Sequence, residues 1–291
     1  MEKTETYTPE TLDEVAALLL AADGQPRPLA QGSSLVARAK GEPAPIVVEL
    51  TRVPELNRLE YEERDGLFIG AALPLGGAME FPPVRDVYSI LADGARQAGP
   101  GNAWARATLA ELLGNEPPMA DLLIPLICLG ATVAIFGPHG WSEMAIEALC
   151  ARGNGAGLQS GEFIVDIRLP APSPRSGGSY FRSPPQGGRM NPMGVGVFLL
   201  MQDDLNTCCG SRLTLWLAPK NPLRALDAER FLRARRLGDG AIQQAGELVA
   251  EASRGLLDQS KRSEEHWQGL RRLGCQAIQG AFERAQTYVG T

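Results

Sequence analysis

Two stretches of small residues carry the groups with which this chain could bind an anion. The first, Ala30–Leu35, reads Ala-Gln-Gly-Ser-Ser-Leu, and the second runs from Ala107 through a Pro-Pro step to Asp121. Gly32 would let the backbone approach a phosphate closely, and a turn that feeds a helix presents backbone N–H groups to an anion. Two other interpretations stay open: Ala30–Leu35 as an ordinary turn after a strand, and Asp121 as a cap of the helix Leu122–Leu129.

Side chains suited to covalent or metal chemistry do not form a pattern. The sequence holds no Ser-His-Asp, Cys-His, Walker or zinc motif, and Asp203 and Asp204 are adjacent, so they do not face each other as an acid/base pair. The five cysteines have no spacing for a metal or an iron–sulfur cluster, and we expect buried or half-buried thiols. We therefore predict no catalytic residue and no metal ligand.

Composition excludes several classes of partner. Of the 291 residues 44% are hydrophobic and 21% charged, and the net charge is −6 without a block of Lys or Arg. These values are typical of a globular protein and give no indication of nucleic-acid binding. The apolar stretches are too short to span a bilayer and the N-terminal residues are polar, so we expect a cytoplasmic protein.

Hydrophobic periodicity and turn residues predict the elements of the N-terminal half. We expect a helix over 10–22 with a capping signal at Thr11 and Glu14, and a short helix over Leu35–Ala39. A helix is also expected over Tyr88–Ala98 and from Asp121 onward. The strands expected here are Arg27–Ala30, Pro45–Leu50, Leu56–Leu59, Leu67–Ala72, Ala131–Phe136 and Glu162–Leu169.

The composition changes after the Pro-rich linker Pro170–Pro174. Beyond Gly177 we expect three antiparallel strands followed by three helices, the last of them over Glu264–Tyr288. The predicted fold is α+β, with two α/β subdomains over 1–55 and 56–174 and an α+β domain over 177–291 that has a small antiparallel sheet.

The order of these motifs resembles the medium, FAD-binding subunit of molybdenum hydroxylases, the carbon monoxide dehydrogenase and xanthine dehydrogenase family. The resemblance covers essentially the whole chain. Its opening motif is present as Tyr7-Thr-Pro9, its small-residue loop as Ala30–Leu35, and its Ile-Gly-Ala strand as Ile69–Ala71. The family's Ala-Thr-Ile-Gly-Gly-Asn motif, continued by Pro-Ala-x-Asp-Leu, aligns with Ala107–Leu122 without gaps, and Gly161–Pro170 matches its exit strand.

The resemblance implies that two subdomains of the FAD-binding, PCMH-like type hold an extended FAD and that the third domain closes over the flavin. The residues implied in cofactor binding are Ala30, Gln31, Gly32, Ser33, Ser34, Leu35, Thr108, Asn115, Asp121 and Arg182. The implied partners are an iron–sulfur small subunit and a molybdopterin large subunit, and an FAD-loaded chain would be the oxidoreductase subunit that passes electrons to an external acceptor.

This sequence departs from the family at the second loop, where Ala110-Glu111-Leu112 replaces Gly-Gly-Asn. The glycines allow a tight backbone nest around the diphosphate, and a carboxylate about 4 Å from it would cost roughly 4 kcal/mol at an effective dielectric constant near 20. The alternative function is therefore a flavin-free homologue that serves as a scaffold or interaction subunit.

Overall fold

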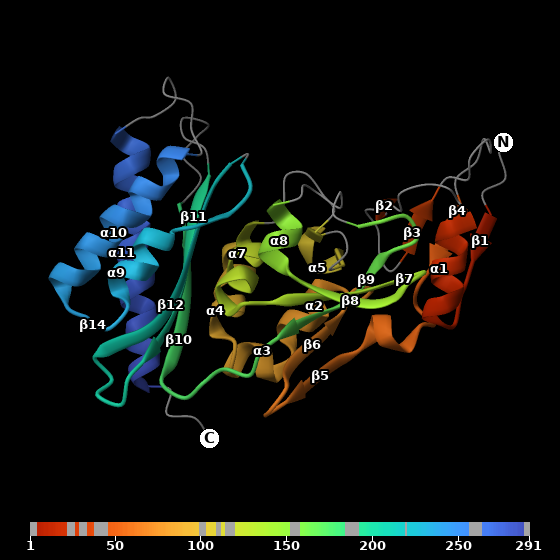
Figure 1. Cartoon of the computed structure of the whole chain (residues 1–291), viewed down its shortest axis with the longest axis horizontal. Coiled ribbons are helices and arrows are strands. Elements are labelled where there is room, and N and C mark those ends of the chain that lie inside the picture. The colour runs from red at the N-terminus through yellow and green to blue at the C-terminus, as the bar shows by residue number, and fades with distance from the viewer. Residues whose placement is uncertain are drawn as a thin grey trace. The chain divides into compact units, whose positions relative to one another are not determined.

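The computed structural model describes residues 5–21, 27–28, 34–37, 46–98, 103–108, 112–113, 120–151, 158–183, 192–218, 220–255 and 264–287. The chain divides into two compact units (Figure 1). The N-terminal unit contains 1–81, 101–118 and 130–171, and the C-terminal unit contains 82–100, 119–129 and 172–291. The three domains predicted from the sequence stay a prediction.

A small sheet begins the N-terminal unit. Its strand order is β1-β4-β3-β2, from β1 (Glu5–Tyr7), β4 (Ile46–Glu49), β3 (Ser34–Ala37) and β2 (Arg27–Pro28). The parallel pair β1 and β4 is connected through α1 (Leu12–Ala21), whose start is capped because the Glu14 N–H donates to Thr11 Oγ1. The predicted capping signal at Thr11 is confirmed.

Two sequence predictions in this unit are wrong. Leu35–Ala39 was expected to begin a helix, but Ser34–Ala37 is β3, which pairs antiparallel with both β2 and β4 and so satisfies its backbone groups on two sides. Leu56–Leu59 was expected to be a strand, but the chain forms the 3₁₀ helix η1 (Pro54–Asn57) there. Pro54 begins this turn, and the Asn57 side-chain amide donates to the carbonyls of Leu50 and Val53.

A second, antiparallel sheet completes the N-terminal unit, in the order β5-β6-β9-β7-β8. Its strands are β5 (Leu59–Glu62), β6 (Gly66–Gly70), β9 (Phe163–Leu169), β7 (Thr132–Gly137) and β8 (Gly140–Ala145). Besides α1 and η1, this unit contains the helices α2 (Leu75–Glu80), α5 (Ala103–Arg106) and α8 (Ile146–Ala151). One apolar core joins α1 and β4 to residues of β9, which include the fully buried Val165.

The C-terminal unit is an antiparallel sheet covered by helices on both faces (Figure 1). Its strands follow the order β10-β11-β12-β13, and β14 also pairs with β12. They are β10 (Ser176–Arg182), β11 (Met193–Met201), β12 (Thr207–Leu217), β13 (Leu223–Arg224) and β14 (Arg235–Arg236). The three main strands were all expected from the sequence.

Helices from distant parts of the chain cover this sheet. Those from the middle of the chain are α3 (Pro82–Asp86), α4 (Ser89–Gln97) and α7 (Ala120–Leu129), and those near the C-terminus are α9 (Leu226–Leu232), α10 (Asp239–Ala252), η2 (Ser253–Gly255) and α11 (Glu264–Thr287). Helices α4 and α7 contact one side of the strands and α11 the other. Among the helices described here, none is long and apolar enough to cross a membrane.

Glycines in β10 and β11 let these helices pack directly on the strands. A Cβ at Gly177 would lie 2.2 Å from the Ala281 carbonyl of α11, and a Cβ at Gly196 would lie 2.5 Å from a methyl carbon of Ile124 in α7. Side chains at either position would push a helix away from the sheet.

Most thiols are sheltered as expected, with Cys128 and Cys208 buried and Cys150 and Cys275 half-buried. Cys209 is exposed, which corrects the expectation for that residue. It occupies the irregular step at which the β11 and β12 register shifts, because Leu200 pairs with Gly210 and Met201 pairs with Cys208.

Candidate functional site

The C-terminal unit brings Asp121 and Arg182 into direct contact. Asp121 lies in the first turn of α7, and Tyr180 and Arg182 lie two residues apart on β10, so that both side chains leave the same face of the strand. The Tyr180 hydroxyl donates to Asp121 Oδ1 at 2.6 Å, and Arg182 Nη1 donates to Asp121 Oδ2 at 2.6 Å. We call these three residues the Asp121 cluster.

The Asp121 cluster is largely shielded from solvent. The side chains of Asp121 and Arg182 are 13% and 25% exposed, and Tyr180 is 1% exposed. Gly194 lies opposite Arg182 on β11 and leaves room for the Tyr180 side chain, because a Cβ at Gly194 would lie 2.5 Å from the Tyr180 hydroxyl oxygen. Asp121 is the second residue of α7, so it does not cap the start of that helix, and its carboxylate accepts hydrogen bonds from two donors on β10.

Burial sets the protonation of the Asp121 cluster. Desolvation raises the pKa of Asp121 above its ordinary value of 3.8, and the Tyr180 hydrogen bond and the Arg182 charge offset part of that rise. Burial and the neighbouring Asp121 charge raise the pKa of the Tyr180 hydroxyl far above its usual range. Tyr180 therefore stays protonated at neutral pH and serves as a hydrogen-bond donor to the carboxylate.

Arg182 keeps a donor that the Asp121 cluster does not use. Its Nε atom is buried and has no hydrogen-bond partner among the residues that the structure describes. A buried N–H without a partner is unfavourable, so this atom fits a ligand oxygen, such as a carbonyl or a phosphate oxygen.

The N-terminal unit holds the described part of the second loop. Thr108 is buried and forms an isolated bridge with Pro74, and its carbonyl accepts the Leu112 N–H at 3.0 Å. Leu112 is fully buried. The replacement of Asn by Leu112 therefore places an apolar side chain in the core, and the N–H of this residue is already used inside the chain.

The remaining predicted site residues divide into two groups. Ser34 and Leu35 lie in the backbone of β3, opposite Glu49 and Val48 of β4. Ala30, Gln31, Gly32, Ser33 and Asn115 lie outside the described residues, together with Ala110 and Glu111. Their roles stay predictions. Within the described part of the chain no group of three or more His, Cys, Asp or Glu side chains could hold a metal ion.

Sequence analysis missed a second polar cluster next to Tyr180. Asp93 of α4 is 6% exposed, and its Oδ2 accepts the Tyr180 N–H at 3.2 Å and Arg284 Nη1 at 2.5 Å. Arg284 Nη2 donates to Asp93 Oδ1, and Arg96 also pairs with Asp93. An acidic residue on the otherwise apolar face of α4 is a signal, but its partner Arg284 is 191 residues away.

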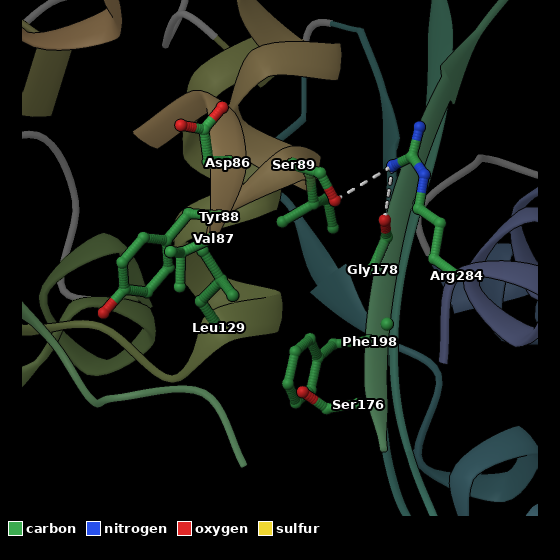
Figure 2. A pocket seen from close by; sticks show the side chains of 11 residues that line it. Asp86, Val87, Tyr88, Ser89, Leu129, Ser176, Gly178, Phe198 and Arg284 are labelled. Carbon is green, nitrogen blue, oxygen red and sulfur yellow. Dashed lines mark hydrogen bonds between the residues drawn. The ribbon is translucent and has the colours of Figure 1, made fainter. Parts of the chain in front are cut away.

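A small cavity adjoins Arg284 in the same unit. Figure 2 shows that one nitrogen of Arg284 donates to both the Ser89 hydroxyl and the Gly178 carbonyl. Phe198 and Leu129 also line the cavity. The cavity holds about 50 Å³, which is room for a few water molecules and far too little for a dinucleotide. Arg284 is therefore a structural link between α11, α4 and β10.

Comparisons with known proteins agree with this architecture. Residues 2–172 match the family described as "FAD binding domain in molybdopterin dehydrogenase". The carbon monoxide dehydrogenase medium chain of Hydrogenophaga pseudoflava is 25% identical over 252 residues, which cover 86% of this chain and 85% of that one.

Solved structures share the fold over nearly the full length. A carbon monoxide dehydrogenase from Hydrogenophaga pseudoflava that lacks the Mo-pyranopterin moiety superimposes with a TM-score of 0.76 at 21% identity, covering 97% of this chain and 98% of that one. Quinoline 2-oxidoreductase from Pseudomonas putida 86 gives a TM-score of 0.75 at 19% identity and covers 98% of both chains. The predicted α+β fold class and the predicted family resemblance are confirmed.

Proposed function

We propose a function from the premise that this chain belongs to the family of FAD-binding domains in molybdopterin dehydrogenases. In this proposal the chain binds FAD and serves as the electron-transfer subunit of a molybdenum hydroxylase-type complex. Its partners would be an iron–sulfur small subunit and a molybdopterin large subunit. The relatives named carbon monoxide dehydrogenase medium chain support this assignment. The substrate of the complex would be bound by one of these partners.

The single observation that carries the proposal is the contact between Asp121 and Arg182. These two residues were selected from family motifs 61 positions apart, and their side chains form a 2.6 Å ion pair. The unpartnered Nε of Arg182 then supplies the donor that a flavin nucleotide would use.

Each residue of the Asp121 cluster has a positioning role in this proposal. Arg182 would hold an oxygen atom of the cofactor, Asp121 fixes the orientation of the guanidinium, and Tyr180 fixes the carboxylate of Asp121. FAD, when bound, supplies the redox chemistry that accepts electrons from a partner and releases them to an external acceptor. No side chain of the Asp121 cluster has to transfer a proton.

The other predicted residues would hold the diphosphate. Backbone N–H groups of Ala30–Ser33, which precede β3, would face the phosphate oxygens, with hydroxyls of Ser33 and Ser34 as further donors. Thr108 and Asn115 complete the proposed set. The Leu112 N–H donates to the Thr108 carbonyl, so this backbone donor of the second loop is not available to the diphosphate.

A titration with FAD, followed by flavin fluorescence, tests the proposal on the full chain. We expect saturable binding by the wild type and affinity weakened about tenfold or more in Arg182→Gln, because a hydrogen bond from a charged donor contributes about 1.5–3 kcal/mol. Arg182→Lys keeps the charge and should retain part of the affinity. Arg272→Gln removes an exposed arginine of α11 in the same unit and should leave binding unchanged.

Two results would count against the proposal. Equal FAD affinity in the wild type and Arg182→Gln would remove Arg182 from the site. A folded wild-type chain that does not bind FAD at all would favour the flavin-free scaffold.

A further inference from the structure

An open groove on the C-terminal unit lies among α7, β11, β12, β13 and α9, and none of the proposed FAD-binding residues lines it. It encloses about 630 Å³, which is within the roughly 300–1,000 Å³ of small-molecule sites. Four of the residues that line it are arginines, so we call it the arginine groove.

The inner surface of the arginine groove is apolar, and Gly210, which has no side chain, leaves a hollow in it. Phe198 and Leu200 of β11 lie opposite Arg212 and Gly210 of β12 in the strand register, and all four line the groove. A Cβ at Gly210 would meet only the Leu200 side chain, at 3.7 Å. On the α9 side, the Leu226 side chain lines the groove and is 53% exposed, so apolar surface remains open to a ligand.

The arginines differ in whether they already have an acidic partner. Arg224 Nε donates to Glu229 Oε1 at 2.9 Å, and its Nη2 donates to Oε2 of the same carboxylate, so that charge is neutralised. Arg230 pairs with Asp227 at the exposed rim. Arg212 and Arg233 also line the groove, and no described acidic side chain pairs with either. The groove is therefore positive although the whole chain has a net charge of −6.

We propose that the arginine groove binds a small amphipathic anion. The ligand's apolar body lies on Phe198 and Leu200 over Gly210, and Arg212 and Arg233 hold its carboxylate or phosphate group. The concave apolar surface favours a compact ligand body over the acidic segment of a protein, because acidic side chains alone would leave the hollow at Gly210 unfilled. This site is independent of the proposed FAD site.

The first experiment uses the fluorescent anion 8-anilinonaphthalene-1-sulfonate on the folded full chain with FAD present. We expect saturable binding that weakens as salt is added, because exposed charges are screened. The uncharged analogue N-phenyl-1-naphthylamine should bind at least about fivefold more weakly. Displacement by decanoate or by decyl phosphate then distinguishes a carboxylate ligand from a phosphate ligand.

Two variants and one control place the probe in the groove. Arg212→Gln with Arg233→Gln should weaken binding about tenfold or more, because the double variant removes both cations that would hold the anionic group. Gly210→Ile keeps every charge, suits a strand and fills the hollow, so it should reduce binding to a similar extent. Arg272→Gln removes a charge elsewhere on the unit and should have no effect.

The proposal is overturned if the folded chain does not bind the probe, or if binding is the same in Gly210→Ile and in the double arginine variant as in the wild type. Displacement by an acidic peptide but by neither decanoate nor decyl phosphate would also overturn it, in favour of a protein partner. Should the double variant fail to fold, Gly210→Ile alone decides. None of these outcomes depends on whether FAD binds.

Discussion

At the scale of single residues, Asp121 depends on two donors to stay inside the protein. Its side chain is 13% exposed, and Tyr180 and Arg182 each contribute one short hydrogen bond to it. A buried carboxylate that loses a donor becomes costly, because water does not replace the lost partner. The Asp121 cluster should therefore behave as one energetic unit.

Tyr180→Phe tests this coupling without changing the shape of the core. We expect the free energy of unfolding to fall by about 1.5–3 kcal/mol, the range for a hydrogen bond to a charged group. Urea denaturation gives the value. In an Asp121→Asn background the same substitution should cost clearly less, and an equal cost in both backgrounds would contradict the coupling.

The raised pKa of Asp121 predicts how the free energy of unfolding changes with pH. The folded pKa of Asp121 is raised above 3.8, so the stability that its protonation contributes is complete below that pH and is lost as the pH rises through the folded pKa. Because the Tyr180 hydrogen bond lowers this pKa, Tyr180→Phe should extend the loss to higher pH. Unfolding free energies measured between about pH 3 and 7 give the pH range over which this stability is lost. Asp121→Asn should abolish this part of the pH dependence.

At the scale of elements, β10 is the strand on which the C-terminal unit is assembled. Helix α11 packs directly on β10 at Gly177. The Tyr180 N–H donates to Asp93 of α4, and the Gly178 carbonyl accepts a hydrogen bond from Arg284 of α11. Three segments far apart in the sequence therefore meet at one strand. Removing the Arg284 side chain, which contacts both α4 and β10, should lower the free energy of unfolding.

Arg284→Gln tests that link. Asp93 is 7% exposed at its side chain, and breaking a buried ion pair leaves an uncompensated charge, so we expect a loss of about 2–4 kcal/mol in urea unfolding. Arg96→Gln is the matched control, because Arg96 pairs with the same carboxylate but is 71% exposed. It should cost less than about 1 kcal/mol, and equal losses for the two variants would refute the role of Arg284.

At the scale of the whole molecule, hydrophobic periodicity predicted most helices and strands, because their formation follows the local order of apolar and polar residues. The helices α1 and α4 and the strands β7 and β9 all fall where their apolar patterns indicate. The two wrong elements have non-local or side-chain causes, namely the pairing of β3 with two neighbours and the Asn57 amide that closes η1.

The candidate site was less predictable than the fold. Family motifs selected Asp121 and Arg182, but their contact depends on how α7 packs on β10, which no local pattern gives. The link between Asp93 and Arg284 joins residues 191 positions apart, and the arginine groove brings Cys128 of α7 together with residues of β11, β12, β13 and α9. Leu112 shows the same limit, since only the fold reveals that its side chain belongs to the core.

FAD binding by this chain is the central claim, and the visible absorption spectrum of the natively purified full chain tests it most directly. We predict the two visible bands of oxidised flavin and equimolar FAD released on denaturation, either as isolated or after incubation with FAD and removal of the excess. A folded but colourless chain that retains no added FAD would contradict the account.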